Sequence, residues 1–236
     1  MRVDAVDVAG LLDDVGRAID ARGRLTIAYA NVHVVNVAQH DPVLRDFLEG
    51  ADRVYADGSG VVLGARMLGA DLGARMTGAD WILDFAARAE REGWRVGWIG
   101  GEYGVAADAV RTLQARHPRL VVPFVRHGRP RGDDGEKQLD HELDDAHLDV
   151  LLVGMGTPVQ ERWVARRRAR LDVPVVWCVG AVADFVSGRT SRGPEWLFRR
   201  QEWLARLLVE PRRLWRRYLI GNPRFVLAVL QQRRRG

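Results

Sequence analysis

The sequence predicts an α/β fold, with a Rossmann-like, mostly parallel sheet flanked by helices, and three observations lead to this prediction. Short apolar runs of strand length alternate with longer segments whose apolar residues recur at helical spacing. Several of these runs end in glycine turns that open a helix, as at Gly100-Gly101. The run at 150–153 is apolar at every position, which is typical of a strand buried on both faces of a parallel sheet.

The clearest strand-to-helix transition is the stretch 149–161, DVLLVGMGTPVQE. We expect Gly154 and Gly156 to allow a ligand to approach the backbone, and Thr157 to cap the following helix. Gln160 then lies on the first helical turn, beside backbone N–H groups that suit an anion such as a phosphate. The stretch therefore predicts a binding site at the carboxyl end of its strand.

Polar groups also follow other predicted strands. These strands span residues 25–30, 53–56, 94–99, 120–125 and 173–179. Because ligands bind beyond the carboxyl ends of parallel strands, we expect the polar groups there to converge on one site. The candidate residues for this site are Asn31, Asp57, Arg75, Gly100, Gly101, Gln160 and Asp184.

One of the two candidate carboxylates, Asp57, has an alternative interpretation. Asp57 precedes Gly58 and Gly60, and an aspartate followed by glycines at a strand end is often only a turn. The functional interpretation is a carboxylate presented at the binding crevice. Asp184 lies in the apolar segment AVADFVSG, where a carboxylate needs a hydrogen-bond donor to offset the cost of burial.

Length and composition limit the class of protein. A chain of 236 residues with 47% hydrophobic composition predicts one α/β domain, over residues 1–190, with a helical appendage over 191–236. Cys178, the one cysteine, lies in an apolar run and is expected to be a buried, inert thiol. No apolar run approaches the roughly 20 residues that span a bilayer. We therefore expect a soluble or peripheral protein of the cytoplasm.

The C-terminal segment is strongly basic. Residues 189–236 hold 13 of the 36 Lys and Arg residues but only three of the 31 acidic residues. Apolar residues recur between the arginines at helical spacing, which predicts basic amphipathic helices divided at Glu210-Pro211 and again at Asn222-Pro223. Such helices bind anionic lipid surfaces, so we expect them to dock on the cytoplasmic membrane. The alternatives are packing on the domain and binding to nucleic acid.

Several common site motifs are missing from the sequence. It contains no Walker A motif, no complete G-x-G-x-x-G fingerprint, no HExxH motif, no Cys/His cluster and no DxD pair. We accordingly predict no metal and no cofactor. Ser59 and Ser187 have no neighbouring histidine pattern, which argues against a hydrolase triad. The arginines at 166–170 are more typical of a solvated helix face than of a nucleic-acid site.

The sequence resembles the WecG/TagA/CpsF family, glycosyltransferase family 26, through a series of motifs in family order that covers nearly the whole chain from about residue 25. The motifs are NVHVV at 31–35, DGSGVV at 57–62, RMTG at 75–78, GGEYGV at 100–105, LLVGMGTPVQE at 151–161, DFVSG at 184–188, EWLARLLVEPRR at 202–213 and RRY at 216–218.

This resemblance implies an inverting, metal-independent glycosyltransferase on the inner face of the cell membrane. It would move N-acetylmannosamine or a related sugar from a UDP donor to a polyprenyl-pyrophosphate-linked sugar, in the synthesis of a cell-surface polysaccharide or teichoic acid. We expect Asp57 to be the general base. The resemblance places the nucleotide near Gly100, Gly101, Glu102 and Asp184, the sugar near Asn31 and Arg75, and the pyrophosphate near Arg206, Arg213 and Arg216.

Two departures from the family pattern leave the donor sugar open. Tyr29 stands where a small hydroxyl residue is usual, and AVAD at 181–184 replaces a more glycine-rich form. The sequence also leaves open whether the chain forms a homo-oligomer. The alternative functions are a nucleotide-binding α/β enzyme of another reaction class and a nucleic-acid-binding module that uses the basic tail.

Overall fold

The structure, a computed structural model, describes residues 1–128, 132–189 and 215–235 and confirms the α/β fold. Its six strands form one sheet in the order β2-β1-β6-β5-β3-β4, and every neighbouring pair is parallel. The strands are β1 (Leu25–Ala30), β2 (Arg53–Ala56), β3 (Arg95–Gly100), β4 (Val121–Arg126), β5 (Val150–Gly154) and β6 (Val175–Cys178). All six carboxyl ends therefore lie along one edge of the sheet.

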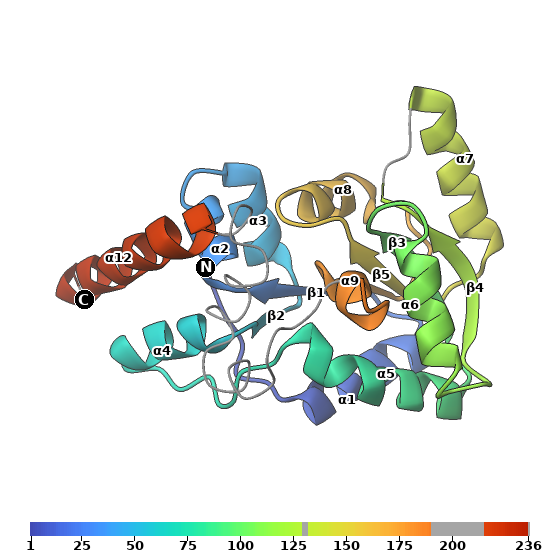
Figure 1. Cartoon of the computed structure of the whole chain (residues 1–236), viewed down its shortest axis with the longest axis horizontal. Coiled ribbons are helices and arrows are strands. Elements are labelled where there is room, and N and C mark those ends of the chain that lie inside the picture. The colour runs from blue at the N-terminus through green and yellow to red at the C-terminus, as the bar shows by residue number, and fades with distance from the viewer. Residues whose placement is uncertain (129–131, 190–214, 236) are drawn as a thin grey trace.

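Helices cover both faces of the sheet (Figure 1). α1, α5, α6 and α9 lie on one face, and α3, α7 and α8 on the other. The helices are α1 (Val8–Asp20), α2 (Val32–Ala38), α3 (Pro42–Gly50), α4 (Ser59–Met67), α5 (Gly78–Glu92), α6 (Val105–Gln114), α7 (Gly132–Asp145), α8 (Val159–Arg167), α9 (Val182–Val186), the π-helical turn η1 (Arg216–Ile220) and α12 (Gly221–Arg235). None of the described helices is both long and apolar enough to cross a membrane.

The central strand β5 is buried on both faces, as its apolar sequence predicts. Leu152 packs in the core cluster that contains Trp98 and Trp177, whereas Leu151 and Val153 pack in the cluster on the other face. Successive side chains of a strand point to opposite faces, so an apolar residue is needed at every position. Cys178 is also fully buried, which confirms that its thiol is part of the core.

Helix α2 was not predicted from the sequence. Its segment, VHVVNVA, is rich in β-branched residues, which favour strands. The helix forms because Asn31 caps it: Asn31 Oδ1 accepts a hydrogen bond from the backbone N–H of Val34 at 3.0 Å. Val34 and Ala38 are then buried against the sheet. A local cap and tertiary packing therefore outweigh the strand propensity of the segment.

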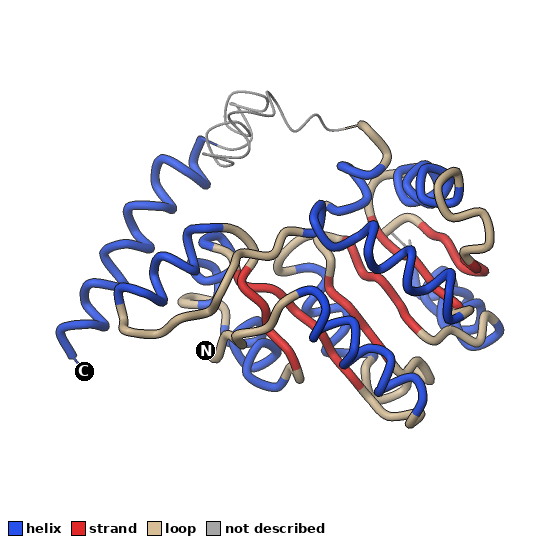
Figure 2. The backbone as a smooth tube through the Cα atoms, turned by 90° about the horizontal axis from the view of Figure 1, so that it is seen from below, coloured by secondary structure: helices blue, strands red, loops and turns tan. Residues whose placement is uncertain are grey.

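The C-terminal helix folds back on the domain. η1 and α12 are continuous, so the expected break at Asn222-Pro223 is wrong. A π-helical turn directly precedes this pair, and such turns occur where the regular hydrogen-bond ladder of a helix is interrupted, as proline does. α12 packs against α2 and α4 beside the edge strand β2, and Figure 2 shows the helix that ends at the C-terminus lying along a neighbouring helix.

Close contacts hold α12 in this position. Asn36 Nδ2 donates a hydrogen bond to the Gly221 carbonyl at 2.8 Å, which ties the start of α12 to α2. A Cβ atom at Gly64 would lie 2.6 Å from Phe225, so the two helices approach closely there because residue 64 has no side chain. The predicted amphipathic helices between residues 194 and 214 lie outside the described residues.

Candidate active site

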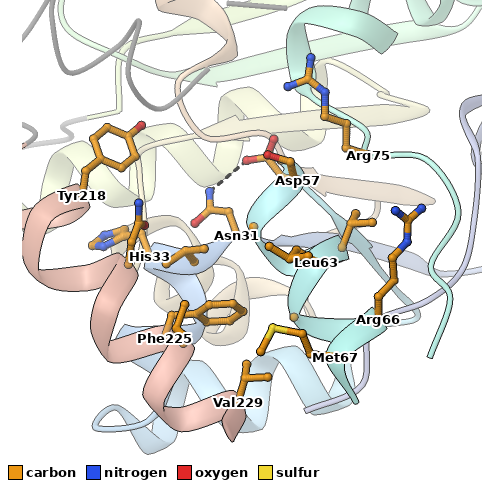
Figure 3. A pocket seen from close by; sticks show the side chains of 18 of the residues that line it. Asn31, His33, Asp57, Leu63, Arg66, Met67, Arg75, Tyr218, Phe225 and Val229 are labelled. Carbon is orange, nitrogen blue, oxygen red and sulfur yellow. Dashed lines mark hydrogen bonds between the residues drawn. The ribbon is translucent and has the colours of Figure 1, made fainter. Parts of the chain in front are cut away.

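The carboxyl ends of β1 and β2 bring Asn31 and Asp57 together. The strands pair Ala30 with Ala56, and Asp57 donates its backbone N–H to the Ala30 carbonyl at 2.9 Å. Asn31 Nδ2 then donates to Asp57 Oδ2 at 2.9 Å (Figure 3). Because Asn31 Oδ1 already caps α2, the amide nitrogen is directed at the carboxylate.

A third segment joins this pair. Asp57 and Met76 form an isolated parallel bridge, and Met76 donates its backbone N–H to the Ala56 carbonyl at 3.0 Å. The bridge places Arg75 beside the strand end. Asn31, Asp57 and Arg75 all line one pocket, so the structure brings these three predicted residues together.

The pocket has a volume of about 690 Å³ and lies between the ends of β1 and β2 and the helices α4 and α12. This size is within the range of ordinary small-molecule sites, roughly 300 to 1,000 Å³. Polar side chains line one end and apolar side chains the other (Figure 3). The polar end includes Asn31, His33, Asp57 and Arg75, and the apolar end includes Leu63, Met67, Phe225 and Val229, with Arg66 beside Met67. Val62 and Arg217 also line the pocket.

His33 and Arg217 belong to the pocket although neither was among the predicted site residues. Burial, with a smaller contribution from the charge of Arg217, lowers the pKa of His33 to about 4. The imidazole is therefore neutral at physiological pH and can act as a hydrogen-bond donor or acceptor. The position of His33, two residues beyond Asn31 at a strand end, is the sequence signal that points to it.

The glycines at 100 and 101 serve close packing of strand ends. Gly100 has φ +150°, and a Cβ atom there would lie 2.2 Å from the Gly154 carbonyl oxygen. Gly101 donates its backbone N–H to the same oxygen at 2.9 Å. Gly100, Gly101, Glu102 and Asp184 are not among the described residues that line the pocket around Asp57. Their predicted contacts with a nucleotide stay a prediction.

Gln160 is buried behind the strand ends. Its Oε1 accepts a hydrogen bond from the Gly180 backbone N–H at 3.0 Å, and its Nε2 donates to Glu161 Oε1 at 2.8 Å. The side chain is 0% exposed, and its bond to Gly180 stabilises the turn after β6. A direct contact between Gln160 and a substrate remains a prediction.

Glu161 completes the same buried network. Its Oε1 also accepts from Thr157 Oγ1 at 2.8 Å, and the Tyr29 hydroxyl lies 3.4 Å from that Oγ1. The prediction that Thr157 caps α8 is therefore wrong. Its hydroxyl bonds to Glu161, and the N-cap residue of α8 is Pro158, which makes no side-chain hydrogen bond to the helix. Burial raises the pKa of Glu161 above its ordinary value.

Comparison with known proteins places this architecture in a family. A family model described as "Glycosyl transferase WecG/TagA/CpsF family" matches residues 1–236. The chain belongs to the WecG/TagA/CpsF family of glycosyl transferases. This confirms the resemblance inferred from the sequence motifs.

Three similar bacterial proteins carry the same name. A Bacillus spizizenii protein is 27% identical over 209 residues, 88% of this chain and 79% of its own length. A Bacillus subtilis protein is 25% identical over 215 residues, covering 91% and 82% of the two chains, and a Staphylococcus aureus protein is 26% identical over 220 residues, covering 92% and 84%. Each is named N-acetylglucosaminyldiphosphoundecaprenol N-acetyl-beta-D-mannosaminyltransferase.

In this member of the WecG/TagA/CpsF family the pocket is rich in cations. Arg66, Arg75 and Arg217 line it together with one carboxylate, Asp57. Such an excess of guanidinium groups suits a phosphate-containing ligand. Across the part of the chain that the structure describes, no three His, Cys, Asp or Glu side chains gather in a way that would hold a metal ion.

The predicted tail arginines are only partly covered by the structure. Arg206 and Arg213 lie outside the described residues. Arg216 is described, and its guanidinium lies 5.2 Å from the centre of the Trp215 ring. The neighbouring residue Arg217, and not Arg216, is among the described residues that line the pocket. A role for the three predicted arginines in binding pyrophosphate stays a prediction.

Proposed function

We propose that this chain transfers N-acetylmannosamine from a UDP donor to N-acetylglucosamine linked to a polyprenyl diphosphate. The names of the relatives support this donor sugar and this acceptor, and membership of a glycosyl transferase family supports the reaction class. The product would serve the synthesis of a teichoic acid or a similar cell-surface polymer. The reaction inverts the anomeric carbon and needs no metal.

The observation that carries this proposal is the oriented carboxylate of Asp57 in a pocket rich in arginine. Asp57 takes the proton from an acceptor hydroxyl while the hydroxyl oxygen attacks the anomeric carbon of the donor. The bond between that carbon and the UDP oxygen breaks, and UDP leaves with the electron pair. One base is enough because UDP leaves readily without protonation.

Negative charge grows on the diphosphate as the donor bond breaks. Guanidinium groups aimed at that position stabilise the transition state more than the ground state. Arg75 is the candidate within the pocket, and Arg206, Arg213 and Arg216 are the candidates from the tail. Backbone N–H groups near the Gly100-Gly101 turn would bind the nucleotide.

The acceptor places the reaction at a membrane. We infer that the chain works as a peripheral protein on the cytoplasmic face, because a polyprenyl-linked sugar resides in the bilayer. Trp215, Leu219 and Ile220 are exposed apolar residues beside Arg216 and Arg217, a composition that suits an anionic lipid surface. Co-sedimentation with vesicles of rising anionic lipid content, at low salt, tests this placement.

A donor screen tests the transferase function. Purified chain is mixed with N-acetylglucosamine linked through diphosphate to a short alkyl chain, and with one UDP-sugar at a time. Mass spectrometry should detect an added N-acetylhexosamine with UDP-N-acetylmannosamine and little with its gluco epimer. An α/β enzyme of another class would bind UDP and transfer nothing, and a nucleic-acid module would show salt-dependent binding to RNA or DNA.

A further inference from the structure

The pocket around Asp57 is divided into a charged half and an apolar half. Asn31, Asp57 and Arg75 lie toward the strand ends, whereas Met67, Phe225 and Val229 lie between α4 and α12 (Figure 3), and Arg217 also lines the pocket. Both halves belong to one continuous cavity of about 690 Å³. A single ligand that extends through both halves would be an amphiphile with a polar head and an apolar tail.

The apolar half is a formed groove with a packed floor. Phe225 and Val229 are buried and contact α4, where Gly64 leaves the space that they occupy. Leu63 on α4 and Val226 on α12 line the same cavity but are 59% and 42% exposed. The groove thus has an apolar floor and an apolar rim, and the rim is accessible from solvent.

Charge indicates which amphiphile fits. Arg75 and Arg217 supply two cations to the lining against the single carboxylate of Asp57, and Arg66, beside Leu63 and Met67, pairs with Asp71 at 3.9 Å. Arg217 makes no ion pair within the described residues, is half-buried, and lies close enough to the half-buried His33 for its charge to contribute to the lowered pKa of that imidazole. A diphosphate head matches this excess of positive charge.

The chemistry of the acceptor fixes where its chain must begin. In a sugar linked through diphosphate to a polyprenyl chain, only two phosphates separate the reacting sugar from the first isoprene unit. If the sugar hydroxyl is at Asp57, the chain begins within the same pocket. The part of that pocket that is apolar, like an isoprene unit, is the groove between α4 and α12.

We propose that the groove between α4 and α12 binds the first isoprene units of the lipid-linked acceptor, with the diphosphate held toward Arg217. This inference rests on the proposed function and deepens it. The groove is then a specificity site for isoprenoid chains, and contact with the chain contributes to acceptor affinity even where no bilayer is present.

Acceptors that differ only in chain length test the groove in solution. N-acetylglucosamine diphosphate carrying a methyl group, one isoprene unit or two isoprene units is offered at concentrations below micelle formation, without lipid or detergent. Each methylene group taken out of water contributes roughly a three- to fourfold gain in affinity. An isoprene unit has five carbons, so complete burial would lower KM by several hundredfold, and because the rim is open to solvent we expect a fall of at least about tenfold for each unit that enters the groove.

A matched pair of double variants shows where the chain lies. Leu63→Gln/Val226→Gln alters the rim of the groove. The control, Leu227→Gln/Leu230→Gln, alters residues of α12 that are 58% and 37% exposed and are not among the described residues that line the pocket. The readout is the ratio of KM for the methyl acceptor to KM for the two-isoprene acceptor, so a general loss of activity does not enter it. Unfolding midpoints check that both variants fold.

The ratio should be large in the wild type and in the control, and should fall by about tenfold or more in the rim variant. An equal ratio in all three proteins would overturn the inference. So would a chain-length effect that appears only when vesicles are added, because the groove would then face the bilayer. If no acceptor is modified by any protein, the proposed function fails instead.

Discussion

Asn31 bridges a helix terminus and a carboxylate: its Oδ1 accepts from the Val34 N–H at 3.0 Å and its Nδ2 donates to Asp57 Oδ2 at 2.9 Å. One side chain therefore supports both the fold of α2 and the orientation of Asp57. The two roles use different atoms of the amide, so suitable substitutions separate them.

Asn31→Ala should lose both roles, whereas Asn31→Ser should lose only one. Serine caps helices as well as asparagine but is too short to reach Asp57. We expect alanine to lower the free energy of unfolding by about 1 kcal/mol and serine to leave it nearly unchanged. Both variants should reduce kcat by about 10- to 100-fold, since a hydrogen bond to a charged group is removed. Urea unfolding and initial rates are the measurements, and normal turnover by the serine variant would contradict the orienting role.

Gly100→Ala should destabilise the sheet edge. The new Cβ atom would lie 2.2 Å from the Gly154 carbonyl oxygen, and the backbone has a φ of +150° that L residues rarely adopt. We expect the free energy of unfolding to fall by about 2 to 4 kcal/mol. Gly50→Ala is the control: it has nothing within 4 Å and should be neutral or slightly stabilising. Equal unfolding curves for the two variants would refute the packing argument.

Glu161 should make stability depend on pH. Burial raises its pKa in the folded state, so above pH 4.5 the folded protein keeps a proton that the unfolded chain releases. The free energy of unfolding contributed by this group is thus highest below about pH 4.5, falls as the pH rises through the folded pKa, and is constant again above it. Each unit of pKa elevation corresponds to about 1.4 kcal/mol.

Glu161→Gln isolates this effect, because glutamine can accept the same hydrogen bonds at Oε1 and does not titrate. The difference in unfolding free energy between variant and wild type should shift in favour of glutamine from pH 5 to pH 8. Asp46→Asn, at an exposed carboxylate outside this network, is the control. A constant difference for Glu161→Gln over this range would mean that the carboxyl ionises normally.

The convergence of Asn31 and Asp57 could be predicted from the sequence alone. Both residues follow strands directly, and the strands are consecutive and parallel, so their ends are neighbours. The direction of Gln160 could not be predicted in this way. It depends on how the first turn of α8 packs against the turn after β6, where Gln160 bonds to Gly180. This packing is a tertiary feature without a local sequence signal.

The contribution of α12 to the pocket was also not predicted from the sequence. Phe225 and Val229 reach α4 only through long-range packing, which periodicity does not show. A weak signal was present in α4: Gly60 and Gly64 stand four residues apart inside a helix. A Cβ atom at Gly60 would lie 2.5 Å from Val32, and one at Gly64 would lie 2.6 Å from Phe225. Glycine on one helix face marks close approach by neighbouring helices.

Transfer should not require a metal ion. The sequence has no DxD pair, and the arginines of the pocket supply the positive charge that a metal would otherwise supply. Initial rates in EDTA should equal those in magnesium or manganese within about twofold. Activity that EDTA abolishes and manganese restores would show that the phosphate site was interpreted wrongly.

The most direct test of the account is the single-turnover rate of Asp57→Asn with UDP-N-acetylmannosamine and a lipid-diphosphate acceptor. Asparagine keeps the shape of the side chain and removes its basicity, and Asp20→Asn on the exposed end of α1 is the control. If Asp57 is the general base, the rate falls by about 100- to 10,000-fold while calorimetry shows donor affinity within about threefold of wild type. A rate close to that of the wild type would contradict the assignment.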